Sequence, residues 1–190
     1  MEIDFSDFKY LGSYVVDCRK DFNTRKALAW SACNQLQPVW QSTLPNKTKI
    51  SCFKACVESI LLYGSETWTM KKELQDRLDG CYTRLLMRVK NISWRQHKTK
   101  AEIYENLPPI SSIVNQRKAR LAGHCHRAKE EIVSDVLLLR LKCPNRGRRP
   151  LNSIGTIVRE TNIQLEDLPT MMKDRKRWQD VVKTYSTVVA

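Results

Sequence analysis

The sequence predicts a mainly α fold, with a short N-terminal β-hairpin, a three-helix bundle and a second small, basic helical region. Two observations predict it. Aromatic and β-branched residues flank a Leu-Gly-Ser step in FKYLGSYVV, residues 8–16, which is typical of strand, tight bend and strand. Apolar residues then recur at spacings of three and four along three successive segments, as amphipathic helices require.

The opening hairpin is expected to need support, because a two-stranded ribbon alone is only marginally stable in water. The three helices that follow can cover one another's apolar faces and one face of the hairpin. We therefore predict a hairpin region at residues 1–18, a helical bundle at 19–92 and a basic C-terminal helical extension at 93–190.

The three bundle helices are predicted from their apolar residues. The first covers residues 23–41 and is kinked or ended early by Pro38. The second starts after a turn in which Asn46 is the expected N-cap, includes Cys56 in its apolar face, and stops at Gly64. The third covers residues 72–89. Their apolar faces comprise Leu28, Ala32, Leu36 and Val39, then Ile50, Phe53, Val57, Ile60 and Leu61, then Leu74, Leu78, Cys81, Leu85 and Val89.

Shorter helices are expected beyond residue 92. They cover residues 101–106, then 113–128 with Ser111 and Ser112 as caps, then 132–141. Residues 143–150, CPNRGRRP, contain one Gly and two Pro and are predicted to be non-helical. Two or three short helices end the chain, and Trp178 is expected to anchor the packing of the last one, as Trp68 does in the bundle.

The charge of the chain indicates an anionic partner. The 33 Lys and Arg exceed the 20 Asp and Glu, which gives a formal net charge of +13. Nucleic acid is the commonest partner for such a surplus, and an anionic membrane surface is the main alternative. No apolar stretch is long enough to span a membrane, and the N-terminus lacks the pattern of a signal peptide. We expect an intracellular, nuclear protein that binds DNA or RNA and no membrane.

The positive charge is concentrated between Arg117 and Arg149, where ten basic residues accompany three acidic ones. Clustered Arg and Lys suit contact with the phosphate backbone, although a solvated helix face is the alternative. RGRRP, residues 146–150, is similar to extended Arg-Gly-Arg-Pro hooks that enter the minor groove, but a basic linker fits it equally well. The expected nucleic-acid-binding residues are Arg117, Lys118, Arg120, Arg127, Arg146, Arg148 and Arg149.

No motif for catalysis, a metal or a cofactor is evident. The seven cysteines include no Cys-x-x-Cys pair, and their odd number favours reduced thiols. His124, Cys125 and His126 point about 100° apart on a helix and are poorly placed to share one ion. The acidic pairs lie among Lys and Arg, and phosphate-loop and nucleophile-elbow motifs are missing. We expect no cofactor and no self-contained active site.

Five stretches in a fixed order resemble the C-terminal part of the endonuclease-reverse transcriptases of non-LTR (LINE-type) retrotransposons. They are FKYLGS, LLYGSETWTM, RLDGCYTRLLMRV, RKARLAGHCHR, and RGRRP followed by DRKRWQDVV, and they extend over residues 8–182. The resemblance implies that Phe8, Tyr10, Leu11 and Gly12 correspond to the primer grip at the palm–thumb junction. Residues 23–89 would be the thumb, and the region after Asn91 the C-terminal extension.

The resemblance also implies what to expect of activity. In this family, the polymerase aspartates that bind Mg²⁺ lie before the hairpin, and this sequence contains no counterpart of them. It contains no counterpart of the family's endonuclease domain either. We therefore expect a fragment that binds nucleic acid without polymerase activity and whose partners include the missing palm and fingers. Trp94, among basic residues, is the expected base-stacking tryptophan. The alternatives are a stand-alone helical DNA-binding module and a non-functional remnant of a mobile element.

Overall fold

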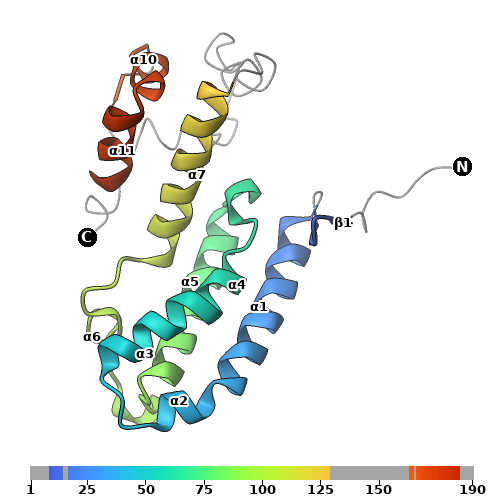
Figure 1. Cartoon of the computed structure of the whole chain (residues 1–190). Coiled ribbons are helices and arrows are strands. Elements are labelled where there is room, and N and C mark those ends of the chain that lie inside the picture. The colour runs from blue at the N-terminus through green and yellow to red at the C-terminus, as the bar shows by residue number, and fades with distance from the viewer. Residues whose placement is uncertain (1–8, 15–16, 129–162, 165, 185–190) are drawn as a thin grey trace, which may run out of the picture. The chain divides into compact units, whose positions relative to one another are not determined.

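The computed structural model of the chain describes residues 9–14, 17–128, 163–164 and 166–184. It is mainly helical, and a short antiparallel hairpin precedes the helices, as the sequence predicts (Figure 1). The described residues belong to two compact units, residues 1–111 and 112–190, and each unit is described by itself. The sequence-based boundaries at 18/19 and 92/93 stay predictions.

The hairpin pairs β1 (Lys9–Tyr10) with β2 (Ser13–Tyr14), so that Lys9 lies opposite Tyr14 and Tyr10 opposite Ser13. The two residues of its turn both adopt the left-handed region, Leu11 at φ 48° and Gly12 at φ 79°. Two successive positive φ angles are typical of the tight turn that matches the twist of paired strands.

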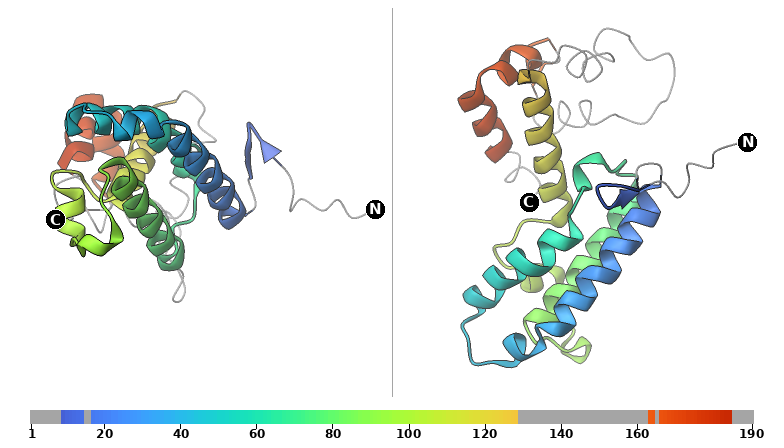
Figure 2. Two further views of the ribbon diagram at one scale, coloured as in Figure 1. Left: turned by 90° about the horizontal axis from the view of Figure 1, so that it is seen from below. Right: turned by 45° about the vertical axis from the view of Figure 1, so that its right-hand side comes forward.

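The first unit is built on α1 (Cys18–Gln35), which packs against the π-helical turn η2 (Lys54–Glu58), α4 (Ser59–Leu61) and α5 (Lys72–Val89). Figures 1 and 2 show these helices side by side, with the hairpin at the start of α1. The remaining elements are α2 (Gln37–Gln41), α3 (Asn46–Phe53), η3 (Ser65–Thr67), η4 (Trp94–Gln96) and α6 (Lys100–Tyr104).

The core of this unit consists mainly of residues from the second and third predicted apolar faces, together with aromatic rings. The face predicted for the first helix was wrong: Leu28 is 47% exposed, and α1 buries Phe22, Ala29 and Cys33 instead. All five expected residues of α5 are buried, and Phe53, Val57 and Leu61 are fully buried. Full burial of side chains of this size contributes about 1.5–3 kcal/mol each. The three-helix core therefore accounts for the fold of the unit, and α5 has the bounds that its periodicity predicts.

Four further local expectations were wrong. The first helix starts at Cys18 because the Asp17 carboxylate caps it, accepting from the backbone N–H groups of Arg19 and Lys20. The early end near Pro38 is confirmed, since α1 ends at Gln35. Pro38 lies in the first turn of α2, where its missing N–H does no harm. Asn46 is the first residue of α3 rather than its cap. Cys56 is exposed.

The fourth error concerns the start of α7 (Ile110–Arg127), which places Ser111 and Ser112 inside the helix rather than before it. In the second unit, α10 (Leu168–Lys173) and α11 (Arg175–Thr184) pack with the part of α7 after Ser111. Their shared core is Ala119, Ala122, Leu168, Met172, Trp178 and Val182. The predicted helix 132–141 and loop 143–150 lie outside the described residues.

Candidate nucleic-acid interface

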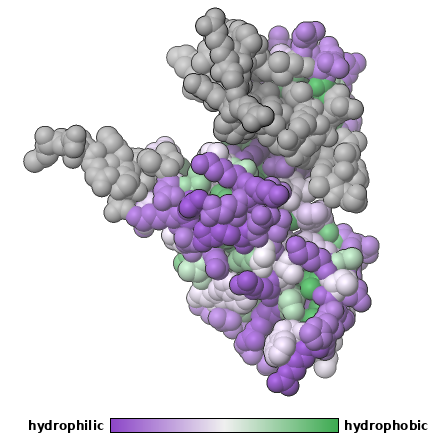
Figure 3. All heavy atoms as spheres, turned by 180° about the vertical axis from the view of Figure 1, so that it is seen from behind, coloured by the Kyte–Doolittle hydropathy of each residue, from purple (hydrophilic) through white to green (hydrophobic). Residues whose placement is uncertain are grey.

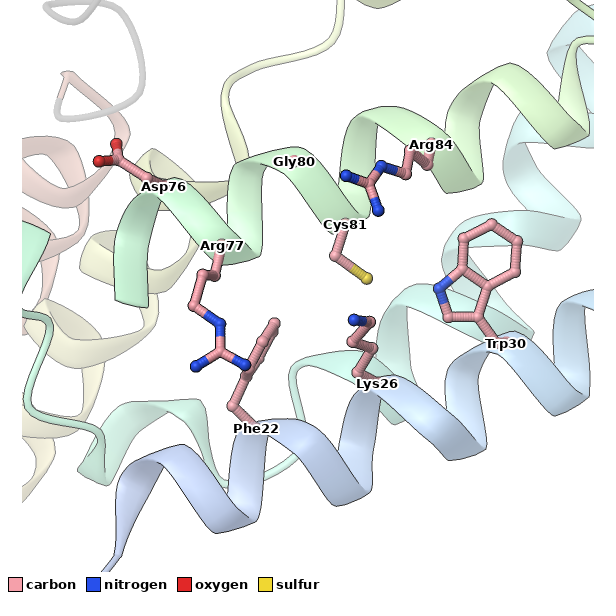
Figure 4. A pocket seen from close by; sticks show the side chains of 8 residues that line it. All are labelled: Phe22, Lys26, Trp30, Asp76, Arg77, Gly80, Cys81 and Arg84. Atoms are coloured by element: carbon pink, nitrogen blue, oxygen red, sulfur yellow. The ribbon is translucent and has the colours of Figure 1, made fainter. Parts of the chain in front are cut away.

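A groove between α1 and α5 combines positive charge with aromatic side chains. Its volume is about 380 Å³, and Figure 4 shows the side chains of both helices that face it. The groove is lined by Phe22, Lys26 and Trp30 from α1, and by Asp76, Arg77, Gly80, Cys81 and Arg84 from α5.

Helical spacing explains why these residues share the groove. Phe22, Lys26 and Trp30 are four residues apart, and residues 77, 80, 81 and 84 of α5 repeat at three and four, so each set lies on one face of its helix. Phe22 is fully buried and Cys81 is 4% exposed, so these two side chains form the floor. Arg77 and Arg84 are exposed, and Trp30 is half-buried.

The cations of the groove remain available to a ligand. Arg77 donates a hydrogen bond of 2.9 Å to the Asn23 side-chain oxygen, and its guanidinium lies 5.7 Å from the centre of the Phe22 ring. These contacts orient the guanidinium but use few of its five N–H donors. Within the described residues, neither Lys26 nor Arg84 has an ion-pair partner.

The Cys81 thiol shows how closely the groove residues converge. Burial raises its pKa, whereas the Lys26 charge, a hydrogen bond with the Trp30 side chain and the Arg84 charge each act to lower it. The thiol is therefore largely protonated at neutral pH and acts as a small hydrophobic surface. The groove contains three cations and one carboxylate, Asp76, so its net charge is positive. A positive groove of this kind suits the binding of phosphate.

Gly80 is the groove residue that has no side chain. It lies in the interior of α5, where glycine is about 1 kcal/mol less favourable than alanine. A Cβ atom built there would meet no heavy atom within 4 Å. Packing within the described protein therefore does not require glycine at this position, and the space beside the helix is open.

The hairpin that resembles a primer grip is held by a buried carboxylate. Asp21, which is fully buried, accepts hydrogen bonds from the Ser13 hydroxyl at 2.8 Å, the Tyr14 backbone N–H at 3.2 Å and the Trp68 indole N–H at 2.8 Å. Arg25 lies 3.8 Å from the same carboxylate. Three donors and a cation compensate for burying the charge, so the hairpin is fixed to the start of α1.

The tip of the hairpin is presented outward. Tyr10 is 62% exposed and Leu11 74% exposed, while the Leu11 carbonyl accepts a hydrogen bond of 2.8 Å from the Tyr63 hydroxyl. The Gly12 carbonyl accepts another from Arg25. The structure thus brings Tyr10, Leu11 and Gly12 to one exposed turn, whereas Phe8 lies outside the described residues.

The basic residues of α7 do not share one exposed face. Arg120 is exposed, Arg117 is half-buried and Lys118 is 9% exposed. Arg127 donates a hydrogen bond of 2.7 Å to the Met172 carbonyl, which lies in the last turn of α10. This cation therefore satisfies the end of a neighbouring helix. Arg146, Arg148 and Arg149 lie outside the described residues.

The three tryptophans singled out by the sequence differ in their surroundings. Trp68 and Trp178 are each 2% exposed, and Trp178 donates a hydrogen bond of 2.9 Å to the Ala119 carbonyl. Both anchor packing, as predicted. Trp94 is 72% exposed, and its ring lies 5.6 Å from the Arg95 guanidinium.

The groove between α1 and α5 was missed in the sequence because its cations come from helices about fifty residues apart. The three cations are separated in the sequence by apolar and polar residues, so no dense run of positive charge marks them. The signal that could have found it is the spacing of Arg77, Gly80 and Arg84, which places a glycine between two arginines on one helical face.

Two findings restrict other kinds of site among the described residues. No three His, Cys, Asp or Glu side chains in this part of the chain come together in a way that could hold a metal ion. None of the helices described is both long and apolar enough to cross a lipid bilayer. On the coloured part of the face in Figure 3, hydrophilic side chains predominate and the apolar patches between them are small.

Comparison with known proteins points to a mobile element. The chain is 26% identical to an uncharacterized transposon-derived protein of Caenorhabditis elegans, over 97% of this chain and 72% of that protein. This similarity supports a transposon origin for the sequence. No family model matches the chain, and no solved structure matches it.

Proposed function

We propose that this chain corresponds to the primer grip, thumb and C-terminal extension of a non-LTR retrotransposon reverse transcriptase, and that it binds the phosphate backbone of nucleic acid. Support for the origin comes from the five ordered stretches, the transposon-derived relative and the hairpin-plus-helices fold. The proposal gives the chain a binding function and no polymerase chemistry. Its partners would be DNA or RNA and a palm domain.

The observation that carries the binding function is the set of three cations in the groove between α1 and α5. Lys26, Arg77 and Arg84 face one open channel, and a phosphate that they neutralise releases its condensed counterions. Backbone contacts of this kind position a protein on nucleic acid without reading the sequence. Arg120 and the arginines of residues 146–149 would add to the same electrostatic attraction.

Fluorescence anisotropy tests the proposal. A labelled template–primer duplex and a labelled single strand are titrated with the chain at about 50 and 200 mM salt, an interval over which backbone binding weakens strongly. The double substitution Arg77→Glu and Arg84→Glu is expected to weaken binding by about tenfold or more, since it replaces attraction by repulsion at two phosphates.

The matched control is Lys47→Glu with Lys54→Glu, which makes the same change in net charge at two exposed lysines that do not line the groove. Equal losses in the two double variants would show that binding follows net charge alone. A soluble, folded chain that binds neither nucleic acid would contradict the proposal and favour a non-functional remnant. Primer extension with dNTP and Mg²⁺ by the purified chain would contradict the assignment of binding without catalysis.

A further inference from the structure

We infer that the groove between α1 and α5 binds an unpaired segment of nucleic acid, with its sugar-phosphate backbone against Gly80 and a base against Trp30. This inference rests on the proposed function and adds to it the class of ligand, a single strand rather than a duplex. Three features of the groove carry it: the spacing of two arginines, the open side of the glycine between them, and the half-buried indole.

The spacing of the arginines fits successive phosphates of one strand. Arg77 and Arg84 are seven residues apart on α5, which corresponds to about 10.5 Å along the helix axis. Phosphates repeat along one strand at a spacing of several ångströms. The two guanidiniums can therefore contact two different phosphates of the same strand, and Lys26 contributes charge from the opposite wall.

Gly80 lies between the two arginines on the same face of α5. No atom of the described protein would contact a Cβ there, although glycine weakens the helix. A ligand backbone that lies against the helix explains the missing side chain, because only glycine lets a ribose or phosphate approach the helix backbone so closely. Arg77 is already oriented by Asn23 and by the Phe22 ring, so little further ordering is needed when a phosphate binds.

Trp30 decides between a single strand and a duplex. Its half-buried indole lines the same groove as the cations and the Cys81 thiol. The bases of a duplex are stacked on one another and cannot reach a side chain inside a groove of this size. An unpaired base can turn toward the indole, and stacking on an aromatic side chain stabilises a bound base regardless of its identity.

Gly80→Ala is expected to change stability and affinity in opposite directions, which tests whether the ligand needs the open space beside Gly80. The added methyl group enters open space and improves helix propensity, so we expect the Tm to rise by about 2–8 °C. Affinity for a labelled 20-nucleotide oligo(dT) or oligo(U) is expected to fall by about tenfold, because the methyl group holds the backbone away from its contacts. The matched control is Asn34→Ala, at an exposed position of α1 outside the groove, which should raise the Tm without changing affinity.

Trp30→Leu and Trp30→Phe test the stacked base. Loss of the ring in Trp30→Leu should weaken oligo(dT) binding by about fivefold or more and weaken duplex binding by clearly less, and Trp30→Phe should retain most of the affinity. Both are measured by anisotropy on full chains whose helical circular dichroism is intact.

The outcomes separate this inference from the proposed function. Binding that is unchanged in both Gly80→Ala and Trp30→Leu, but lost in the double arginine variant, would refute the single-strand site and leave backbone binding standing. Equal losses for single strands and duplexes in Trp30→Leu would also refute it. A wild-type chain that binds no nucleic acid would refute the proposed function itself.

Discussion

Replacing Gly123 of α7 by alanine gives the sharpest prediction about the fold, because replacing Gly80 by alanine should have the opposite effect on stability. An alanine Cβ at position 123 would lie 2.2 Å from Nε1 and 2.3 Å from Cδ1 of Trp178. Contacts below 3.0 Å cannot be tolerated, so the indole must move. Trp178 then loses its hydrogen bond to the Ala119 carbonyl and part of its burial in the core of the second unit.

The expected net effect can be worked from these contacts. Overpacking a well-filled site costs about 1–3 kcal/mol, and the lost hydrogen bond adds about 1 kcal/mol. The gain in helix propensity on replacing glycine by alanine returns about 1 kcal/mol. We therefore expect Gly123→Ala to lower the free energy of unfolding by about 2 kcal/mol, whereas Gly80→Ala raises it by about 1 kcal/mol.

Urea denaturation followed by circular dichroism measures both variants, and hydrogen exchange of peptides from α11 locates the change. Gly123→Ala should lower the midpoint and reduce protection in residues 175–184. Adding Trp178→Phe should recover part of the loss, since a smaller ring leaves room for the methyl group. A Gly123→Ala chain that is as stable as Gly80→Ala would refute the packing of Trp178 against α7.

Two further predictions concern acidic residues of the first unit. Asp21→Ala removes the acceptor of the Ser13 hydroxyl, the Tyr14 N–H and the buried Trp68 indole N–H, so it should destabilise the chain by about 3 kcal/mol. Asp17→Ala, which removes only a helix cap, should cost about 1 kcal/mol. Urea midpoints would show this order, and equal losses would contradict it. Asp79 has a raised pKa, chiefly because of burial. Its charged form therefore opposes folding at neutral pH, and lowering the pH through the folded pKa relieves this effect. Asp79→Asn should raise stability at pH 7 and flatten the stability profile in mild acid, and an unchanged profile would count against the burial of this carboxyl.

The fold was predictable where one helical face decides burial. The apolar residues of α5 repeat without interruption, so residues 72–89 could be assigned from spacing alone. The π-helical turn η2 could not be assigned from spacing, because it depends on tertiary contacts. It turns Cys56 outward and Glu58 inward, where the Glu58 carboxylate accepts a hydrogen bond of 2.7 Å from the Tyr82 hydroxyl. A buried carboxylate of this kind has no signature in a local sequence pattern.

The candidate site was less predictable than the fold, because charge in a sequence does not show which cations are used internally. Arg127 belongs to the most basic segment, yet it binds the Met172 carbonyl at the end of α10. Arg77 and Arg84 lie among acidic and apolar residues in the sequence, yet folding brings both to the groove with Lys26. Only the packing of α1 against α5 brings these three cations together.

The salt dependence of single-strand binding tests the central claim most directly. The logarithm of the association constant is measured against the logarithm of salt concentration for the wild-type chain and for Arg77→Ala with Arg84→Ala. If the groove neutralises a phosphate with each arginine, the slope of the double variant should be smaller in magnitude by about 1.4, at about 0.7 per lost phosphate contact. Parallel lines for the two proteins would show that these arginines contact no phosphate, and would contradict the account.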